Sequence, residues 1–167
     1  MRATQIEAIL IRLSQERIEF VVIGGVAALA HGVARVTFDV DLCYRRTHEN
    51  VERLCRVLAP LHPMLRGASP DIPFRFDVPT VLAGLNFTLN TDLGDLDLLG
   101  EVAGLGEYDA VQAASETLPL YGLPMQVVTI EGLLAAKRAA GREKDQEAIV
   151  ELEALLELRK RPPEHRD

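Results

Sequence analysis

The sequence predicts an α+β fold in which a mixed β-sheet is packed by helices. Three observations support this class: a short, continuous apolar run from Phe20 to Ile23, stretches in which polar and apolar residues alternate, and stretches with apolar residues at helical spacing. The 167 residues are enough to bury a sizeable core. We expect residues 1–128 to form the core domain and residues 129–167 to form a C-terminal helical segment packed on it.

Composition excludes several classes of protein. Because 48% of the residues are hydrophobic and no long low-complexity run occurs, the chain is not expected to be disordered. The net charge of −7 argues against a broad basic surface for duplex nucleic acid, but it is compatible with a local basic patch. Cys43 and Cys55 are interpreted as reduced packing residues of a cytoplasmic protein without a signal peptide. The longest apolar run is too short to span a membrane.

The first elements follow from local patterns. An amphipathic helix is predicted over residues 3–16, with Thr4 as its cap. The apolar run Phe20 to Ile23 reads as a buried strand that ends at Gly24 and Gly25. A short helix then runs over residues 26–30 and stops at Gly32, and a strand is predicted from Val33 to Leu42.

The rest of the chain continues the mixture of helices and strands. Four of the nine prolines lie in the stretch 61–79, which is therefore predicted to be irregular, and residues 78–85 are left ambiguous. The further elements expected are a helix capped by Thr47, strands at 86–90 and 94–100, a loop at 104–106, a short helix at 109–115, a hairpin formed by 117–121 and 125–128, a helix from Thr129 to Gly141, and a last helix at 142–160.

Two carboxylates stand out in the strand predicted from Val33 to Leu42. Alternation puts Asp39 and Asp41 on one face, roughly 6 to 7 Å apart along the chain, and puts the apolar residues Val36, Phe38, Val40 and Leu42 on the other. Carboxylates that repel each other at this distance suit a divalent cation such as magnesium, which prefers oxygen ligands. The simpler alternative is the solvated face of an edge strand.

Gly24 and Gly25 suggest a second half of the same site. A backbone without Cβ atoms can approach a phosphate chain closely, and a helix that follows directs free amide groups at it. The alternative is an ordinary tight turn.

Asp97 is the candidate for a third carboxylate. It lies between Leu96 and Leu98 in a segment that otherwise reads as a buried strand, where an unpaired charge would cost several kcal/mol. Asp97 therefore needs a partner. Asp95 shares its face, so the choice between the two stays open, although the apolar neighbours favour Asp97.

Together these residues resemble a known family. The pattern of the nucleotidyltransferase superfamily, which includes polymerase beta, the aminoglycoside nucleotidyltransferases and minimal bacterial members, is similar to three features of this chain. These are Gly24-Gly25, Asp39-Val40-Asp41-Leu42 separated from Gly25 by thirteen residues, and Asp97. The stretch from Lys137 to Asp145 is similar to the Lys…Arg-x-Lys-Asp segment of a small prokaryotic branch that includes AbiEii-like toxins. The resemblance covers about residues 18–158.

The resemblance implies a fold, a cofactor and a site. The fold would be polymerase beta-like, and two magnesium ions, with manganese as an alternative, would act on a nucleoside triphosphate such as ATP. The metal-binding and catalytic residues would be Asp39, Asp41 and Asp97. The nucleotide would be held by Gly24, Gly25, Thr37, Lys137 and Lys144.

Several of these residues also have a simpler interpretation. Lys137, Arg142, Lys144 and Asp145 could be exposed helix charges in i,i+4 pairs. Arg35 shares the carboxylate face, and its role is left undecided. His31 is predicted to be a capping or surface residue, and because no second His or Cys stands at metal-ligand spacing, zinc is not expected.

The function predicted from the sequence is magnesium-dependent transfer of a nucleoside monophosphate from a triphosphate to a hydroxyl of RNA, protein or a small molecule. An acceptor such as a tRNA end would be held by the basic residues near the C-terminus. The enzyme could be the toxin of a toxin–antitoxin pair, with an antitoxin or a second copy as its partner. The competing hypothesis is a catalytically silent binding module of the same fold.

Overall fold

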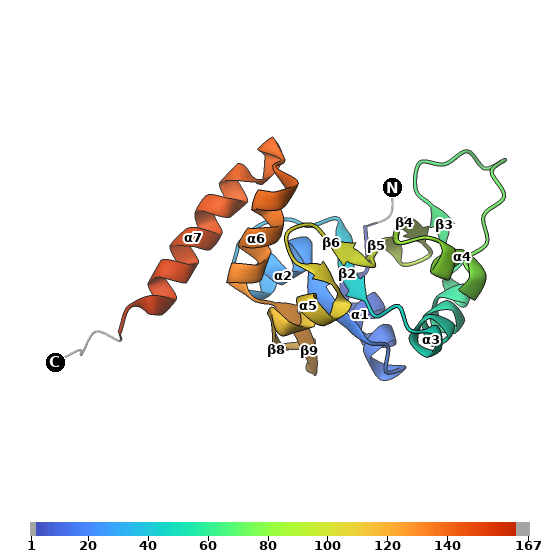
Figure 1. The fold of residues 1–167 in the computed structure, drawn as a ribbon, viewed down its shortest axis with the longest axis horizontal. Helices are drawn as coiled ribbons and strands as arrows, with labels where there is room; N and C mark the ends of the chain where they lie inside the picture. The colour runs from blue at the N-terminus through green and yellow to red at the C-terminus, as the bar shows by residue number, and fades with distance from the viewer. Residues whose placement is uncertain (1–2, 163–167) are drawn as a thin grey trace.

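The computed structural model describes residues 3–162, which form one large mixed sheet with helices around it (Figure 1). The strand order is β3-β4-β5-β2-β1-β9-β8. In chain order the strands of this sheet are β1 (Phe20–Ile23), β2 (Asp39–Tyr44), β3 (Met64–Leu65), β4 (Asn86–Thr91), β5 (Gly94–Leu99), β8 (Ser115–Leu120) and β9 (Leu123–Val128). A separate small hairpin consists of β6 (Glu101–Val102) and β7 (Gly106–Glu107).

Helices lie around the sheet and at its two ends. In Figure 1, α6 and α7 stand at one end and α3 and α4 at the other. The helices are α1 (Ile6–Gln15), α2 (Gly24–Ala30), α3 (His48–Leu58), α4 (Val78–Ala83), α5 (Tyr108–Ala113), α6 (Ile130–Ala140) and α7 (Gln146–Lys160), with short 3-10 turns η1 (Ala59–Leu61) and η2 (Glu143–Asp145). The arrangement confirms the predicted α+β class.

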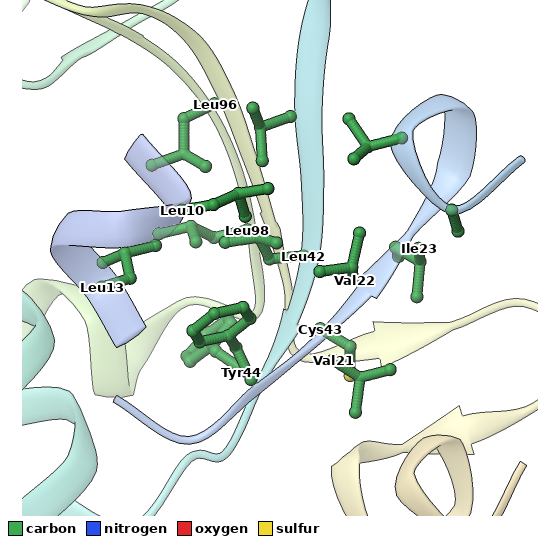
Figure 2. Packing of buried hydrophobic residues seen from close by; sticks show 14 of the residues in the cluster. Leu10, Leu13, Val21, Val22, Ile23, Leu42, Cys43, Tyr44, Leu96 and Leu98 are labelled. Atoms are coloured by element: carbon green, nitrogen blue, oxygen red, sulfur yellow. The ribbon is translucent and has the colours of Figure 1, made fainter. Parts of the chain in front are cut away.

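The centre of the sheet supplies the core. β2 pairs antiparallel with β1 and parallel with β5. Every residue of β1 is buried, whereas β2 and β5 alternate between buried apolar and half-buried acidic side chains. Figure 2 shows Leu10 and Leu13 of α1 packed beside Leu42 and Leu98 of the two alternating strands. The apolar face of these strands therefore packs on α1, and the opposite face is left for polar side chains.

The C-terminal helices follow the sequence signals closely. The Thr129 hydroxyl accepts a hydrogen bond from the Gly132 amide at the start of α6, and Gly141 ends that helix with a φ of +62°. The last predicted helix begins later than expected, because η2 precedes α7. The division into residues 1–128 and 129–167 stays a prediction, and residues 163–167 of the second segment lie outside the described residues.

The strand predicted from Val33 to Leu42 is shorter than expected. Its first half, residues 33–38, is irregular, and β2 starts only at Asp39. Val36 and Phe38, expected on the inner face, are 80% and 75% exposed. No neighbouring strand pairs with residues 33–38 to form a ladder, so alternation there does not correspond to burial.

One further expectation is wrong, and another holds in part. Thr4 does not cap α1; its hydroxyl donates to the Phe38 carbonyl at 2.5 Å and accepts from the Asp95 amide at 3.0 Å. His31 is the C-cap of α2, as expected, but it is not a surface residue, since its side chain is buried and its Nε2 lies 2.7 Å from the Val128 carbonyl oxygen. Both side chains make contacts that are distant in sequence and that the local pattern does not indicate.

Cys43 and Cys55 are buried free thiols, as expected for packing residues. Burial raises the pKa of Cys43 to about 12 and that of Cys55 to about 11, which suppresses their reactivity. Within residues 3–162, no helix combines the length and apolar character that crossing a bilayer requires.

Candidate active site

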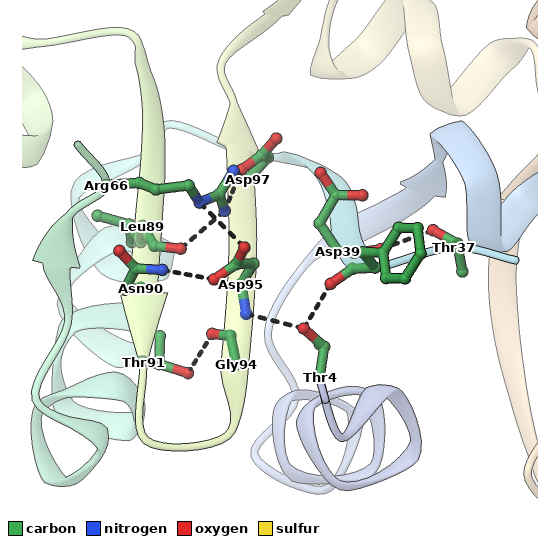
Figure 3. Close-up of polar contacts among 11 residues, drawn as sticks. Thr4, Thr37, Asp39, Arg66, Leu89, Asn90, Thr91, Gly94, Asp95 and Asp97 are labelled. Carbon is green, nitrogen blue, oxygen red and sulfur yellow. Dashed lines mark hydrogen bonds and ion pairs between the residues drawn. The ribbon is translucent and has the colours of Figure 1, made fainter. Parts of the chain in front are cut away.

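The parallel pairing of β2 and β5 brings the acidic residues together. In this register Asp39 lies opposite Asp95, and Asp41 lies opposite Asp97. Since alternate residues of a strand point the same way, all four carboxylates lie on the face away from α1. Asp39, Asp41 and Asp97 each offer an oxygen atom, and these atoms lie within 4.8 Å of one another. Figure 3 shows Asp39 and Asp97 on neighbouring strands, with their carboxylates on the same side.

The geometry also separates Asp97 from Asp95. The Asp95 carboxylate turns toward β4, where the Asn90 amide donates to its Oδ1 at 2.5 Å. Asp95 is not part of the group of three converging carboxylates. Asp97, two residues further along β5, is therefore the residue that joins Asp39 and Asp41.

Burial and mutual repulsion raise the pKa of two carboxyl groups in this cluster. Burial, followed by the negative charges of Asp39 and Asp97, raises the pKa of Asp41 from 3.8 to about 7. A backbone hydrogen bond from Gly25 opposes this shift. The pKa of Asp39 is raised as well, first by burial and then by Asp97, while Arg66 lowers it. Without a cation the cluster thus favours holding a proton.

The glycine pair fits against the side chains of the cluster. A Cβ at Gly24 would lie 2.2 Å from Oδ2 of Asp41, and Gly24 has a φ of +63°, which L side chains rarely adopt. A Cβ at Gly25 would lie 2.6 Å from the Thr37 hydroxyl oxygen. These glycines start α2 rather than precede it. Their lack of side chains makes room for Asp41 and Thr37, a reason that the sequence alone does not indicate.

A cleft of about 790 Å³ opens over the carboxylates. The residues predicted to hold metal or nucleotide all line this cleft, together with Arg66, Arg142 and Asp145; they are Gly24, Gly25, Thr37, Asp39, Asp41, Asp97, Lys137 and Lys144. One wall is apolar and includes Val102, Leu105, Leu133 and Ala136. The structure therefore brings residues that are far apart in the sequence to one cavity.

The basic wall of the cleft is organised by Asp145. Its Oδ1 accepts from Lys137 Nζ at 3.1 Å, and its Oδ2 accepts from Arg142 Nε at 2.7 Å. Burial raises the pKa of Asp145, but the hydrogen bonds from Lys137 and Arg142 outweigh it, so that the pKa lies below its ordinary value. Lys144 is exposed at the rim. Lys137 is thus a largely buried, fixed charge rather than a solvated one.

Arg35, whose role the sequence leaves undecided, turns away from the cleft. Its guanidinium pairs with Glu147 at 3.1 Å and Glu151 at 2.8 Å on α7. It is not among the residues that line the cavity. Arg35 therefore ties the segment before β2 to the last helix.

Sequence reasoning missed Arg66 and the exposed pair Val36 and Phe38. Arg66 NH2 donates to Asp97 Oδ1 at 2.8 Å, although it belongs to a stretch without periodicity (Figure 3). Val36 and Phe38 line the cleft beside Asp39. No pattern in the sequence around Arg66 indicates its contact, because the pairing of β3 with β4 creates it.

Comparison with known proteins bears on the fold. Neither a protein-family model nor a curated protein sequence matches the chain. Among solved structures, the lincosamide antibiotic adenylyltransferase LnuA in its lincomycin-bound form is 14% identical, with a TM-score of 0.61 over 93% of this chain and 99% of that one.

Two further structures are similar. An antigenic nucleotidyltransferase-like protein from Paracoccidioides brasiliensis is 17% identical, with a TM-score of 0.57 over 92% of this chain and 74% of that one. A candidate nucleotidyltransferase from Thermotoga maritima is 15% identical, with a TM-score of 0.55 over 92% of this chain and 96% of that one. The chain therefore has the fold of the nucleotidyltransferase superfamily.

Proposed function

We propose that this protein is a magnesium-dependent nucleotidyltransferase that moves a nucleoside monophosphate from a triphosphate to a hydroxyl group. The observation that carries the proposal is the convergence of Asp39, Asp41 and Asp97, whose oxygen atoms lie within 4.8 Å of one another beside the glycine pair. The fold shared with nucleotidyltransferases supports it.

The donor set fits magnesium. Carboxylate oxygens are the ligands that a small, hard divalent cation prefers, and the three groups come from two rigid, paired strands. Burial and the neighbouring charges of Asp39 and Asp97 raise the pKa of Asp41 to about 7, and a bound cation would offset the repulsion among these carboxylates. Manganese, with similar ligand preferences, would fit the same oxygen atoms.

The reaction exchanges one phosphoester bond for another. The acceptor hydroxyl oxygen forms a bond to the α-phosphorus, the bond from that phosphorus to the bridging oxygen breaks, and pyrophosphate leaves. Magnesium bound there would neutralise charge on the phosphates and on the attacking oxygen. Asp39, Asp41 and Asp97 would hold the metal, and Asp97 would also orient the hydroxyl and accept its proton.

The basic wall suits the triphosphate. Lys137 is held by Asp145 and faces the cleft, and Lys144 stands exposed at its rim. As compact cations they would bind the β and γ phosphates, with the backbone at Gly24 and Gly25 on the other side. Thr37, whose hydroxyl donates to the Asp39 carbonyl at 3.1 Å, would fix the loop that adjoins the metal-binding strand.

The cleft favours a small acceptor. A volume of about 790 Å³ must hold the nucleotide as well as the acceptor, and one wall is apolar. The net charge of −7 disfavours a long nucleic-acid footprint, although the basic wall could still hold one RNA end. LnuA, whose structure contains lincomycin, is a neighbour with a small-molecule ligand.

The test is pyrophosphate release by the purified protein with each triphosphate, magnesium and fractionated acceptors. Asp39→Ala and Asp41→Ala should each lower the rate by at least about 100-fold, because each removes a metal ligand. Asp71→Ala, which removes an exposed carboxylate from the 66–77 loop, is the matched control and should match the wild type. Full activity in both cluster variants would disprove the proposal.

The competing function is a catalytically silent binding module of the same fold. A titration that finds no magnesium-dependent binding of any triphosphate would favour it. The four in-register carboxylates speak against this alternative, since a module without chemistry gains nothing from their repulsion.

A toxin role in the cytoplasm, with an antitoxin or a second copy as partner, extends the proposal and has the AbiEii-like resemblance as its support. Growth arrest on expression of the wild type, absent with Asp39→Ala, is the expected result. If the wild type and Asp39→Ala arrested growth equally, the arrest would not depend on nucleotide transfer.

A further inference from the structure

Arg66 lies at the edge of the carboxylate cluster without being one of its acids. It follows β3 directly, and its backbone amide donates to the Thr88 carbonyl at 2.9 Å, which continues the pairing with β4. From there its side chain reaches over β4 to β5. In Figure 3 its guanidinium lies beside Asp97 and above Asp95.

Three neighbours fix the guanidinium. Its NH2 group donates to Asp97 Oδ1 and to the Leu89 carbonyl, both at 2.8 Å. Its Nε forms an ion pair with Oδ2 of Asp95 at 3.3 Å. The geometry of this contact is not that of a hydrogen bond, so Nε has no hydrogen-bond partner among the described residues. The side chain is only 28% exposed and that of Asp97 only 17%. Arg66 is thus anchored to the main chain of β4 while it contacts both carboxylates of β5.

This arrangement ties the Asp97 carboxylate both to Arg66 and to the cluster. Arg66 donates a charge-assisted hydrogen bond to Oδ1 of Asp97, while an oxygen of the same carboxylate lies within 4.8 Å of oxygens of Asp39 and Asp41 on β2. Among the described residues, the same guanidinium is the cation that pairs with two of the four in-register carboxylates, Asp95 and Asp97. Its planar donor fork also restricts rotation of the carboxylate it holds.

Resting on the function proposed above, we propose that Arg66 is a positioning residue. It orients Asp97 toward Asp39 and Asp41 and offsets part of the negative charge of the cluster. Loss of Arg66 should therefore change two quantities in opposite directions, with metal affinity rising and turnover falling. Removing the cation strengthens the attraction for a divalent ion, whereas freeing Asp97 from its hydrogen bond impairs the step in which Asp97 meets the hydroxyl.

The experiment measures both quantities on the full chain. Manganese binding is followed by electron paramagnetic resonance, and turnover by pyrophosphate release. In Arg66→Ala we expect manganese to bind about three- to tenfold more tightly, because a positive charge near the carboxylates is lost. We expect kcat to fall about tenfold or more, with KM for the triphosphate within about twofold of the wild type.

Two further variants sharpen the result. Arg66→Lys restores the charge but not the planar fork, so manganese affinity should return to within about twofold of the wild type while kcat recovers only in part. In an Asp97→Asn background, Arg66→Ala should change kcat far less than in the wild type, because Arg66 acts through Asp97. Arg56→Ala, at a 70% exposed arginine of α3, is the control for loss of an arginine and should change neither quantity.

The outcomes separate this inference from the proposed function. Manganese binding that is unchanged or weakened in Arg66→Ala would overturn the inference, as would an unchanged kcat. The manganese titration decides the role of Arg66 even if no triphosphate turns over. An absence of turnover by the wild type with every triphosphate would count against the proposed function alone.

Discussion

Gly24 shows how a single missing side chain can determine a site. Its positive φ and the 2.2 Å approach that a Cβ would make to Asp41 Oδ2 leave room for glycine only. The need for glycine at this position of α2 therefore comes from Asp41, which lies on β2. A substitution here acts on the Asp41 carboxylate before it acts on any ligand.

Gly24→Ala is expected to destabilise the fold by about 1 to 3 kcal/mol, from backbone strain together with displacement of Asp41. Metal-dependent activity should fall with it. The matched control is Gly122→Ala, at a φ of +78° with no atom within 4 Å of the added Cβ, which should show the backbone cost alone. Urea unfolding and manganese titration of both variants check this. Equal manganese affinity in the two variants would contradict it.

The pKa of Asp41 makes stability depend on pH. Its ordinary value of 3.8 is raised to about 7 in the folded chain, so between these values the folded state holds a proton that the unfolded state has released. Without metal, the free energy of unfolding should therefore be highest below pH 4 for this group and fall as the pH rises toward 7, by a few kcal/mol at most.

Magnesium should oppose this loss, because it favours the ionised carboxylate. The measurement is urea unfolding at pH 5 and pH 8 with chelator and with magnesium. Asp41→Asn, which cannot ionise, should show a smaller difference between the two pH values. The prediction is contradicted if, in chelator, raising the pH from 5 to 8 stabilises the wild type relative to Asp41→Asn.

For single residues, the sequence predicts well the direction in which the acidic side chains point, and predicts poorly the contacts of their neighbours. Alternation within β2 and β5 predicts which way Asp39, Asp41 and Asp97 point, because a strand has a fixed period of two. Arg66 is unpredictable by the same reasoning, since its contact depends on how β3 pairs with β4. The roles of the site residues remain a proposal.

Among elements, the start of β2 depends on the residues before α1. The Thr4 hydroxyl bridges the Phe38 carbonyl and the Asp95 amide, and thus joins the residue before β2 to the second residue of β5 (Figure 3). Gly94 permits this approach, because a Cβ there would lie 2.5 Å from Thr4 Cα. The N-terminal segment therefore bridges the two acidic strands where they begin.

Thr4→Val keeps the shape of the side chain but removes both hydrogen bonds. It is expected to cost about 1 to 3 kcal/mol, because the Asp95 amide loses its partner. Thr4→Ser, which keeps the hydroxyl, should lie within about 0.5 kcal/mol of the wild type. Thermal or urea unfolding measures the difference. A Val variant as stable as the Ser variant would show that the bridge contributes nothing.

Elements with strong local signals are predicted more accurately than those without. Threonine caps and a glycine terminator define α3 and α6 within a residue or two. The stretch 33–38 misleads, because its alternation resembles a strand although no partner strand lies beside it. The β6–β7 hairpin is too short for a pattern, so the sequence predicts only the loop at residues 104–106.

For the whole molecule, the cleft combines an acidic and a basic wall. The carboxylates come from the middle of the sheet, and Lys137 and Lys144 come from the C-terminal segment. A triphosphate carrying magnesium matches both walls, whereas either component alone matches one. Binding of metal and nucleotide should consequently be cooperative.

Magnesium with a non-hydrolysable triphosphate should raise the melting temperature more than the sum of the two separate shifts. At about 100 times the dissociation constant the gain is about 2.7 kcal/mol, which corresponds to about 5 to 10 °C for a chain of this size. Differential scanning fluorimetry gives the comparison. Asp71→Ala should retain the combined shift and Asp41→Asn should lose most of it. Additive shifts in the wild type would argue against a shared cleft.

The overall architecture could be predicted because the chain's local patterns agree with its fold. The buried run of β1, the glycine pair and the two acidic strands together suffice to indicate the superfamily fold. The order of the seven strands and the size of the cleft depend on long-range pairing that periodicity does not contain. The acceptor depends on that cleft, which is why the sequence leaves it open.

The register between β2 and β5 has a consequence for how such a chain can be altered. Inserting one residue inside either strand would turn every acid beyond it toward the core. The exposed residues 69–73 carry no such restriction, because they lie in the irregular segment between Arg66 and the partly buried Phe74. Insertions there should leave the alignment of the acidic strands, and with it the carboxylate cluster, unchanged.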